Sequence, residues 1–579
     1  MTFFYISRDQ RALIIHGLLS RGASGLLRHV RRSPSLLWLS FHLSAIFFFC
    51  APAPAESRSS PTTDKVVCAK CHAIETQRYL STAMGKSFVA PEKYPEAVVK
   101  QQSSGSSISV SFRDDTMFHK LTEHGLVAEY PIRYQVGGGM EGSSFFIQLR
   151  NYLFESPLSW YNAFGWDLSP GYESRSVIEF ERPITKECLF CHASRARFDD
   201  PDGRHLNGTP TSIGCERCHG PSGEHVRHPS STNIVNPSKL AGPARKSICE
   251  QCHLEGNTRV LNPGKDWTDF RAGEPAEDVF TTFVLTGERQ GEQIPLASEV
   301  EQFAQSRCAQ MSKGKLWCGT CHNPHADHRS RAAEIRAICT SCHQKPSPAT
   351  HPASLTECTS CHMPTNGKTT IAHASNTDHR ILRPGEQPPD EGKKLKLSAW
   401  RQPRQNFQQR NLGIAELRLS RQDYQDLWSD GGDLLLSLGA PSHDDSDIVF
   451  SLTAFYLDSG DLPRALEFAR RAVELSPQSA VRTLTLARIL ETSGADDKAE
   501  QQFVKAIALN PSWKEPYGRL TMFYVRRNKF EEAIKVLDRY LTWNPNEILF
   551  HEWRKQILSQ ENAGTGSRLP SQPAIPPTR

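Results

Sequence analysis

The pattern CxxCH occurs seven times between Cys68 and His362. In each copy, two thiols can form thioether bonds to the vinyl groups of one porphyrin, and the adjacent imidazole can bind its iron. The copies comprise Cys68, Cys71 and His72; Cys188, Cys191 and His192; Cys215, Cys218 and His219; Cys249, Cys252 and His253; Cys318, Cys321 and His322; Cys339, Cys342 and His343; and Cys358, Cys361 and His362. The pattern predicts seven covalently attached haem c groups, with the seven histidines as proximal iron ligands.

Structural zinc is the alternative use of CxxC pairs, but zinc does not require a histidine next to the second cysteine. Histidine makes up 22 of 579 residues, so seven adjacent histidines by chance have a probability on the order of 10⁻¹⁰. The motifs use 14 of the 16 cysteines and leave only Cys50 and Cys308, so a disulfide framework lacks partners. We expect Cys308 to be a small buried residue, with a haem ligand or a reactive thiol as the alternatives.

The N-terminus predicts export. Arginines precede an apolar run at residues 36–49, and Ala53-Pro54-Ala55 follows as an A-x-A cleavage site, so residues 1–55 are interpreted as a secretory signal peptide. The run is shorter than the roughly 20 residues of a membrane span, which favours cleavage over a retained anchor. We expect an exported protein without an integral span, located in the periplasm or at the cell surface.

Net charge excludes one class of partner. Residues 1–55 carry six Arg and one Asp, so removing them from 68 basic and 63 acidic residues leaves 62 of each. Seven haems, each with two propionates and a ferric core, would make the protein about seven units negative. No nucleic-acid partner is expected.

The spacing of the motifs divides the predicted cytochrome domain, residues 56–380, into a long gap after the first motif and a part from Cys188 onward that is dense in motifs. A β-rich insertion is expected at about 100–182, because Ile108, Val110 and Phe112 alternate with polar residues, as do later runs. From Cys188 to His379 the chain lacks long apolar periodicity, so the porphyrins are expected to form much of the core. The predicted fold class is multidomain, with a haem-packed, loop- and helix-rich cytochrome c carrying this insertion.

An all-α solenoid is expected to follow. Residues 381–410 are rich in Pro, Lys, Gln and Arg and are interpreted as a linker. Pro477, Pro511 and Pro545 then recur every 34 residues, the period of tetratricopeptide repeats. We place this domain at 411–560, with repeats at about 446–479, 480–513 and 514–547, and a disordered tail at 561–579. Such a solenoid offers a surface for a protein partner, or it braces the cytochrome or mediates self-association.

The second axial ligand of each iron decides the chemistry. Irons with two histidines are saturated and pass electrons, whereas an iron with an open face can bind substrate. Enough histidines lie outside the motifs to saturate seven irons, with Met311 and Met363 as weaker candidates. The candidate distal ligands are His119, His205, His225, His325, His351, His373 and His379.

At these motifs the chain resembles the cytochrome c-554 and c-prime family, which is related to hydroxylamine oxidoreductase and pentahaem nitrite reductase. The likeness lies in CERCHGPSGEHV, IVNPSKL with CEQCHLEG, CGTCHNPH, CTSCHMP and the TDHRI that contains His379, within residues 66–383. The chain looks especially similar to bacterial proteins that join such a cytochrome region to tetratricopeptide repeats. Catalytic members of the wider group use a haem with a lysine ligand or a tyrosine crosslink, and all seven motifs here end in histidine.

These observations favour a protein that relays electrons between a redox donor and an acceptor, with the repeats docking a protein partner. One alternative is a reductase or dehydrogenase of small nitrogen or sulfur oxyanions at one open haem. The other is a scaffold that assembles respiratory proteins, with the haems secondary.

Overall fold

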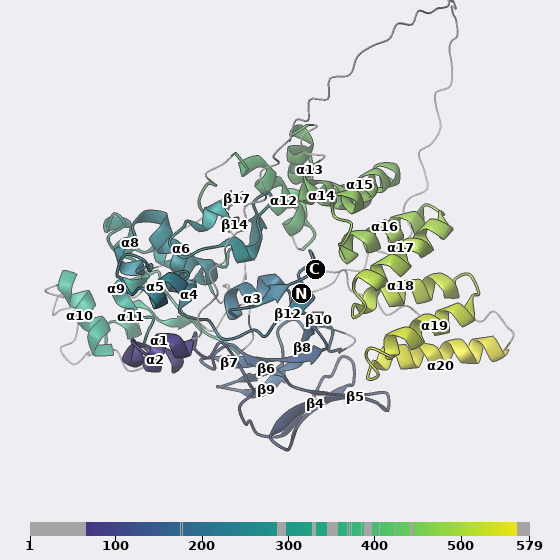
Figure 1. The fold of residues 1–579 in the computed structure, drawn as a ribbon, viewed down its shortest axis with the longest axis horizontal. Coiled ribbons are helices and arrows are strands. Elements are labelled where there is room, and N and C mark those ends of the chain that lie inside the picture. Colours follow the sequence, from purple (N-terminus) through teal and green to yellow (C-terminus); the bar gives the residue numbers. More distant parts are fainter. Residues whose placement is uncertain are drawn as a thin grey trace, which may run out of the picture. The chain divides into compact units, whose positions relative to one another are not determined.

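The computed structural model describes residues 65–563 apart from short internal segments. These segments are 174, 176–177, 287–296, 327–331, 344–356, 367–368, 370, 372, 384, 387–395, 404–405, 423 and 440–443. The predicted signal peptide and most of the predicted tail therefore lie outside the described residues. Along the chain, two short helices are followed by strands, then by short motif-bearing helices, and finally by paired helices (Figure 1). Within the described ranges, no helix combines the length and apolar character needed to span a bilayer.

Two antiparallel sheets form the part between the first and second motifs. Their strands are β1 (Phe88–Val89), β2 (Ala97–Lys100), β3 (Ser107–Arg113), β4 (Thr116–Glu123), β5 (Leu126–Pro131), β6 (Tyr134–Val136), β7 (Gly142–Leu149), β8 (Tyr152–Tyr161), β9 (Gly165–Leu168) and β10 (Arg182–Pro183). One sheet has the order β1-β6-β7-β8-β10 with β9 beside β8, and the other has the order β2-β3-β4-β5. The prediction of a β-rich region is confirmed, although its strands begin at Phe88, before residue 100.

The alternating pattern marks strands correctly but misses two breaks. The apolar run from Tyr130 to Val136 is divided between β5 and β6, which belong to different sheets. The register between β7 and β8 shifts between Ser144 and Phe146, which alternation along β7 does not reveal. Phe145 and Phe146 are both buried because adjacent side chains point to opposite faces of the sheet, and the two pack into separate core clusters.

Each CxxCH motif forms about one helical turn. The motif-bearing helices are α1 (Lys65–Ala69), α3 (Lys186–His192), α4 (Glu216–His219), α6 (Gly242–His253), α9 (Cys318–Cys321), α10 (Ala332–Cys342) and α11 (Thr359–His362). The histidine N–H bonds to the carbonyl of the first cysteine in several motifs, for example from His219 to Cys215 at 2.9 Å. Residues at i, i+3 and i+4 share one helix face. The motif spacing therefore directs both thiols and the imidazole to the same side.

The predicted linker is partly ordered. Strand β17 (Lys396–Ala399) pairs with β14 (Phe280–Thr286), which also pairs with β13 (Thr258–Leu261). Arg401 then forms ion pairs with the buried Glu250 and Glu277. The predicted linker over 381–410 thus includes residues that complete a sheet and neutralise buried carboxylates.

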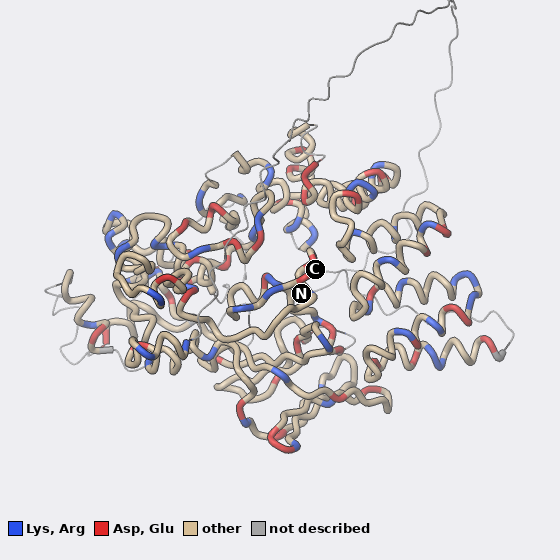
Figure 2. The backbone as a smooth tube through the Cα atoms, in the orientation of Figure 1, with Lys and Arg blue, Asp and Glu red and all other residues tan. Residues whose placement is uncertain are grey.

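The C-terminal helices form antiparallel pairs along the chain (Figure 1). They are α12 (Gln408–Ser420), α13 (Trp428–Ser437), α14 (Ser446–Asp458), α15 (Leu462–Leu475), α16 (Ala480–Thr492), α17 (Asp496–Leu509), α18 (Lys514–Val525), α19 (Phe530–Leu541) and α20 (Ile548–Ala563). Ala465, Ala499 and Ala533, which also recur every 34 residues, each have no exposed surface. Lys and Arg are interspersed with Asp and Glu along these helices (Figure 2).

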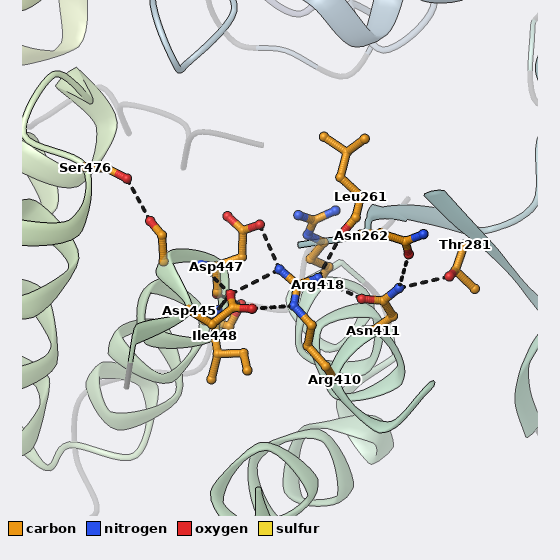
Figure 3. Close-up of polar contacts among 12 residues, drawn as sticks. Leu261, Asn262, Thr281, Arg410, Asn411, Arg418, Asp445, Asp447, Ile448 and Ser476 are labelled. Atoms are coloured by element: carbon orange, nitrogen blue, oxygen red, sulfur yellow. Dashed lines mark hydrogen bonds and ion pairs between the residues drawn. The ribbon is translucent and has the colours of Figure 1, made fainter. Parts of the chain in front are cut away.

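Helix α12 anchors the paired helices to the motif-bearing part. The Asn411 side-chain amide donates to Asn262 Oδ1 at 2.8 Å and to Thr281 Oγ1 at 2.9 Å (Figure 3). Arg410 donates to the Leu261 carbonyl at 2.8 Å and pairs with Asp445 at 2.6 Å (Figure 3). Because these groups are largely buried, each needs a partner inside the protein. The network ties α12 to both the β13–β14 sheet and the first turn of α14.

Candidate haem site

One cavity of 3850 Å³ is lined by both cysteines and the histidine of every CxxCH motif. These residues come from seven separate segments spread between Cys68 and His362. The cavity volume divided by seven motifs is about 550 Å³ per motif, within the roughly 300–1,000 Å³ that encloses one cofactor-sized ligand. The space around the motifs therefore fits one porphyrin at each of them.

The protonation of several histidines suits iron binding. Nδ1 of His219 lies 2.8 Å from the Val235 carbonyl, and Nδ1 of His362 lies 2.9 Å from the Leu382 carbonyl. A carbonyl oxygen can only accept, so each Nδ1 must carry the proton and leave the lone pair of Nε2 free. A metal-bound histidine has this tautomer, with its other nitrogen held by an acceptor. Both carbonyls lie at least 16 residues from their histidine, and no motif in the sequence marks them.

Three predicted distal histidines lie opposite proximal ones. The imidazole centres are 6.4 Å apart for His72 and His225, with 19° between the ring planes. They are 5.9 Å apart at 13° for His219 and His325, and 6.1 Å apart at 31° for His322 and His379. Two imidazole nitrogens each about 2 Å from one metal ion, on opposite sides, place the ring centres roughly 6 Å apart. Each pair is therefore spaced to hold a single iron.

One distal histidine of these pairs has the same tautomer. Nδ1 of His379 lies 2.7 Å from the Thr377 carbonyl, so Nδ1 carries the proton and leaves Nε2 as the available donor to iron. Nδ1 of His225 lies 3.0 Å from both the Ser230 carbonyl and Asn233 Oδ1, and the backbone N–H of Ser230 also lies 3.4 Å from it. His225, His325 and His379 all line the cavity.

His119 lies elsewhere, in the core of the β-rich region. Its side chain has no exposed surface, and Nδ1 is 2.7 Å from Ser156 Oγ. Its ring packs edge-on against Phe145 and Trp166, at 5.4 and 5.3 Å between centres. Burial lowers its pKa to about 3, so this imidazole is neutral. The prediction of His119 as a distal ligand is therefore wrong in this structure, because the residue faces strand β8 and does not line the cavity.

His205 and His373 also fail to line the cavity. Nε2 of His373 is 2.7 Å from Asp167 Oδ2, and its ring stacks on Phe164 with 3.9 Å between centres. His205 packs edge-on against Tyr152 at 5.2 Å. These contacts occupy the nitrogens or faces that a ligand would need, which corrects both predictions. His351 lies outside the described residues.

The remaining sulfur candidates do line the cavity. Cys308 and Met311 lie on α8 (Arg307–Met311), and Met363 follows the last motif. Cys308 is only partly buried, and burial raises the pKa of its thiol. The expectation that Cys308 is a buried packing residue is therefore not met in full, because α8 turns it toward the cavity.

Contacts between thiols place the motifs next to one another in an order different from that along the chain. Cys215 raises the pKa of Cys68, Cys252 that of Cys191, Cys318 that of Cys249, and Cys358 that of Cys339, so the two thiols of each pair lie close together. The interaction with Cys191 lowers the pKa of Cys252 to about 7, whereas burial raises the pKa of Cys68 to about 11. The first motif thus contacts the third, the sixth contacts the seventh, and the fourth contacts both the second and the fifth.

Comparisons with known proteins agree with a two-part chain. A family described as "Cytochrome c554 and c-prime" matches residues 172–220, which contain the second and third motifs. The human "Antiviral innate immune response effector IFIT1" is 24% identical over 137 residues, which cover 22% of this chain and 29% of that protein. The match thus spans less than a third of this curated relative.

Two solved structures each match a part of the chain. A structure of "MamA MSR-1 C2" is 21% identical, with a TM-score of 0.23, and the match covers 27% of this chain and 86% of that one. "First TPR of Spaghetti (RPAP3) bound to HSP90 peptide SRMEEVD" is 24% identical, with a TM-score of 0.19, and the match covers 20% and 95%. Together with the motifs and the helix pairs, the family match supports a cytochrome c with covalent haem, joined to a domain of tetratricopeptide type.

Proposed function

We propose that this protein is an exported heptahaem c-type cytochrome that relays electrons between a redox donor and an acceptor. The observation that carries the proposal is that all seven motifs line one cavity although they are spread over the chain. Short separations between cofactors suit transfer from one iron to the next. The thiol contacts between motifs support such a sequence of neighbours.

The chain's own contribution would be attachment and orientation. The fourteen motif cysteines would hold the porphyrins through thioether bonds, and the seven motif histidines would bind the irons from one side. Haem, when bound, supplies one-electron redox chemistry at its iron. His225, His325 and His379 would bind three of the irons from the other side, and the carbonyls of Val235 and Leu382 would fix two proximal rings.

The helical domain would brace the cytochrome part as well as offer a surface for a protein partner. Ser479, Trp513 and Glu547 occupy the same position in successive 34-residue repeats. Ser479 Oγ donates to Asp202 at 2.6 Å, and the Arg204 guanidinium lies 4.6 Å from the centre of the Trp513 ring. These loops are thus engaged within the chain, which supports the bracing role. Docking of a protein partner is a separate proposal for the rest of the solenoid surface.

Mass spectrometry and low-temperature EPR of the oxidised holoprotein test the proposal. The mass should show seven haems, and the EPR spectrum should contain only low-spin signals that account for all of them. Fewer than seven haems would contradict the count. One stoichiometric high-spin haem would instead favour the reductase or dehydrogenase of small nitrogen or sulfur oxyanions.

The scaffold alternative is tested separately. Immobilised holoprotein should retain its redox partner from a mixture of purified periplasmic cytochromes in proportion to its haem content. If capture instead follows the helical domain, and a chain without attached haem captures equally well, assembly rather than electron transfer is the main role.

A further inference from the structure

Helix α7 (Glu299–Gln305) connects two of the motifs. Glu299 Oε2 lies 3.4 Å from Nδ1 of His253, the proximal histidine of the fourth motif. Three residues later, Gln302 Oε1 accepts a hydrogen bond from the backbone N–H of His379 at 2.9 Å. Positions i and i+3 lie on the same face of a helix. One face of α7 therefore reaches His253 and the residue paired with His322 of the fifth motif.

Glu299 is the carboxylate of this region that faces the iron ligand. Its neighbour Glu301 accepts the backbone N–H of Gly256 at 2.8 Å, and Glu255 accepts that of Ala297 at 3.1 Å. Those two carboxylates therefore hold the surrounding loop. Glu299 instead begins the helix, lines the cavity and points to His253.

The partner of His253 differs in charge from those of two other proximal histidines. His219 and His362 donate Nδ1–H to neutral backbone carbonyls. A carboxylate carries a full negative charge, which makes the imidazole more basic than a neutral carbonyl does. A more basic imidazole gives more electron density to its iron, and the ferric state gains more from this than the ferrous state does.

We propose that Glu299 is a positioning residue that lowers the reduction potential of the haem at the fourth motif below that of the haems at the third and seventh motifs. This inference rests on the proposed function. It deepens that function because the fourth motif contacts both the second and the fifth through its thiols. The potential at this junction decides how electrons divide between the two neighbours.

The test is a potentiometric titration of holoprotein followed by haem absorption, comparing the wild type with Glu299→Gln. In Glu299→Gln, the component of the titration that belongs to the fourth-motif haem should shift about tenfold toward the ferrous state. For a one-electron couple, this raises its reduction potential by about 59 mV. Glu301→Gln is the matched control: it makes the same substitution on the same helix and should leave that component in place. His253→Met identifies the component, because a methionine ligand raises the potential of the haem it binds.

Two results would overturn the inference. An unchanged potential in Glu299→Gln would show that the carboxylate does not act on His253, and equal shifts in both glutamine variants would show a general charge effect instead. If Glu299→Gln fails to fold, the comparison of the wild type with His253→Met still tests the inference. The component whose potential changes in His253→Met belongs to the fourth-motif haem, and in the wild type its potential must be lower than those of the haems at the third and seventh motifs. A protein without bound haem would contradict the proposed function itself, which the mass measurement detects first.

Discussion

Replacing Lys514 with methionine should loosen the junction between the β-rich region and the helical repeats. Its Nζ lies 2.9 Å from Glu179 Oε1, 3.0 Å from Glu181 Oε1 and 2.6 Å from Glu547 Oε1. Only 11% of the Lys514 side chain is exposed. Burial raises the pKa of Glu181, and the charges of Glu179 and Glu547 add to this effect.

The magnitude follows from what the substitution leaves behind. Methionine keeps the length of the aliphatic stem but removes the one positive charge among three buried carboxyl groups. Removing one partner of a buried ion pair costs about 3–5 kcal/mol, because the remaining charge stays out of water. For a unit of the size of the helical region, this corresponds to a fall in Tm of roughly 6–20 °C.

Thermal unfolding of the holoprotein, followed by far-UV circular dichroism of the helices, measures the effect. The control is Lys535→Met, since Lys535 pairs with Glu531 at 3.5 Å and both side chains are 74% exposed. That variant should unfold at the wild-type temperature. Adding Glu179→Gln to the Lys514 variant should recover part of the loss, because it removes one of the carboxylates left without a cation. Equal Tm values for the two lysine variants would refute the reasoning.

Three further predictions concern other sites. Burial, with the nearby Asp430 adding to it, raises the pKa of Glu416 to about 7. The contribution of protonated Glu416 to the free energy of unfolding is therefore fully present below about pH 4.5 and is lost as the pH rises through 7. Glu416→Gln should therefore gain about 1–2 kcal/mol in urea unfolding at pH 8 and nothing at pH 4.5, and a pH-independent gain would contradict this. His225→Ala should give a high-spin haem signal in EPR, while His373→Ala should leave the spectrum unchanged. The reverse result would contradict the role of His225 as a distal iron ligand. Asn411→Leu should cost about 1–3 kcal/mol in the same urea assay, because two buried polar groups of the adjacent sheet lose their partner; an unchanged midpoint would argue against that anchor.

Local spacing made much of the fold predictable. Cysteines at i and i+3 with histidine at i+4 share a face within one helical turn, so the motif geometry needs no distant contact. The 34-residue period likewise predicted paired helices, and the alanines at that period are fully buried. Alternation predicted strands in the β-rich region. It did not predict that both faces of β7 are covered, with Phe145 and Phe146 buried in separate core clusters.

The order along the chain could not show which motifs are neighbours. Cys191 contacts Cys252 of the fourth motif although the third motif lies between them in the sequence. Part of the segment predicted as a linker forms strand β17. The sequence did not show this, because the partner strand β14 lies more than 100 residues earlier. Such contacts depend on how distant segments pack together, and no periodicity within a segment encodes them.

The distal histidines show most clearly which features follow from the sequence and which depend on packing. The sequence by itself determined seven CxxCH motifs and a surplus of histidines, and it predicted seven haem attachment sites with their proximal ligands, because each of these is a matter of spacing or number. Among the candidates, His225 and His373 were equivalent in the sequence. Only the tertiary structure placed His225 opposite His72 and set His373 against Asp167 and Phe164. An axial ligand is defined by its position relative to an iron held elsewhere in the chain, and packing alone fixes that position.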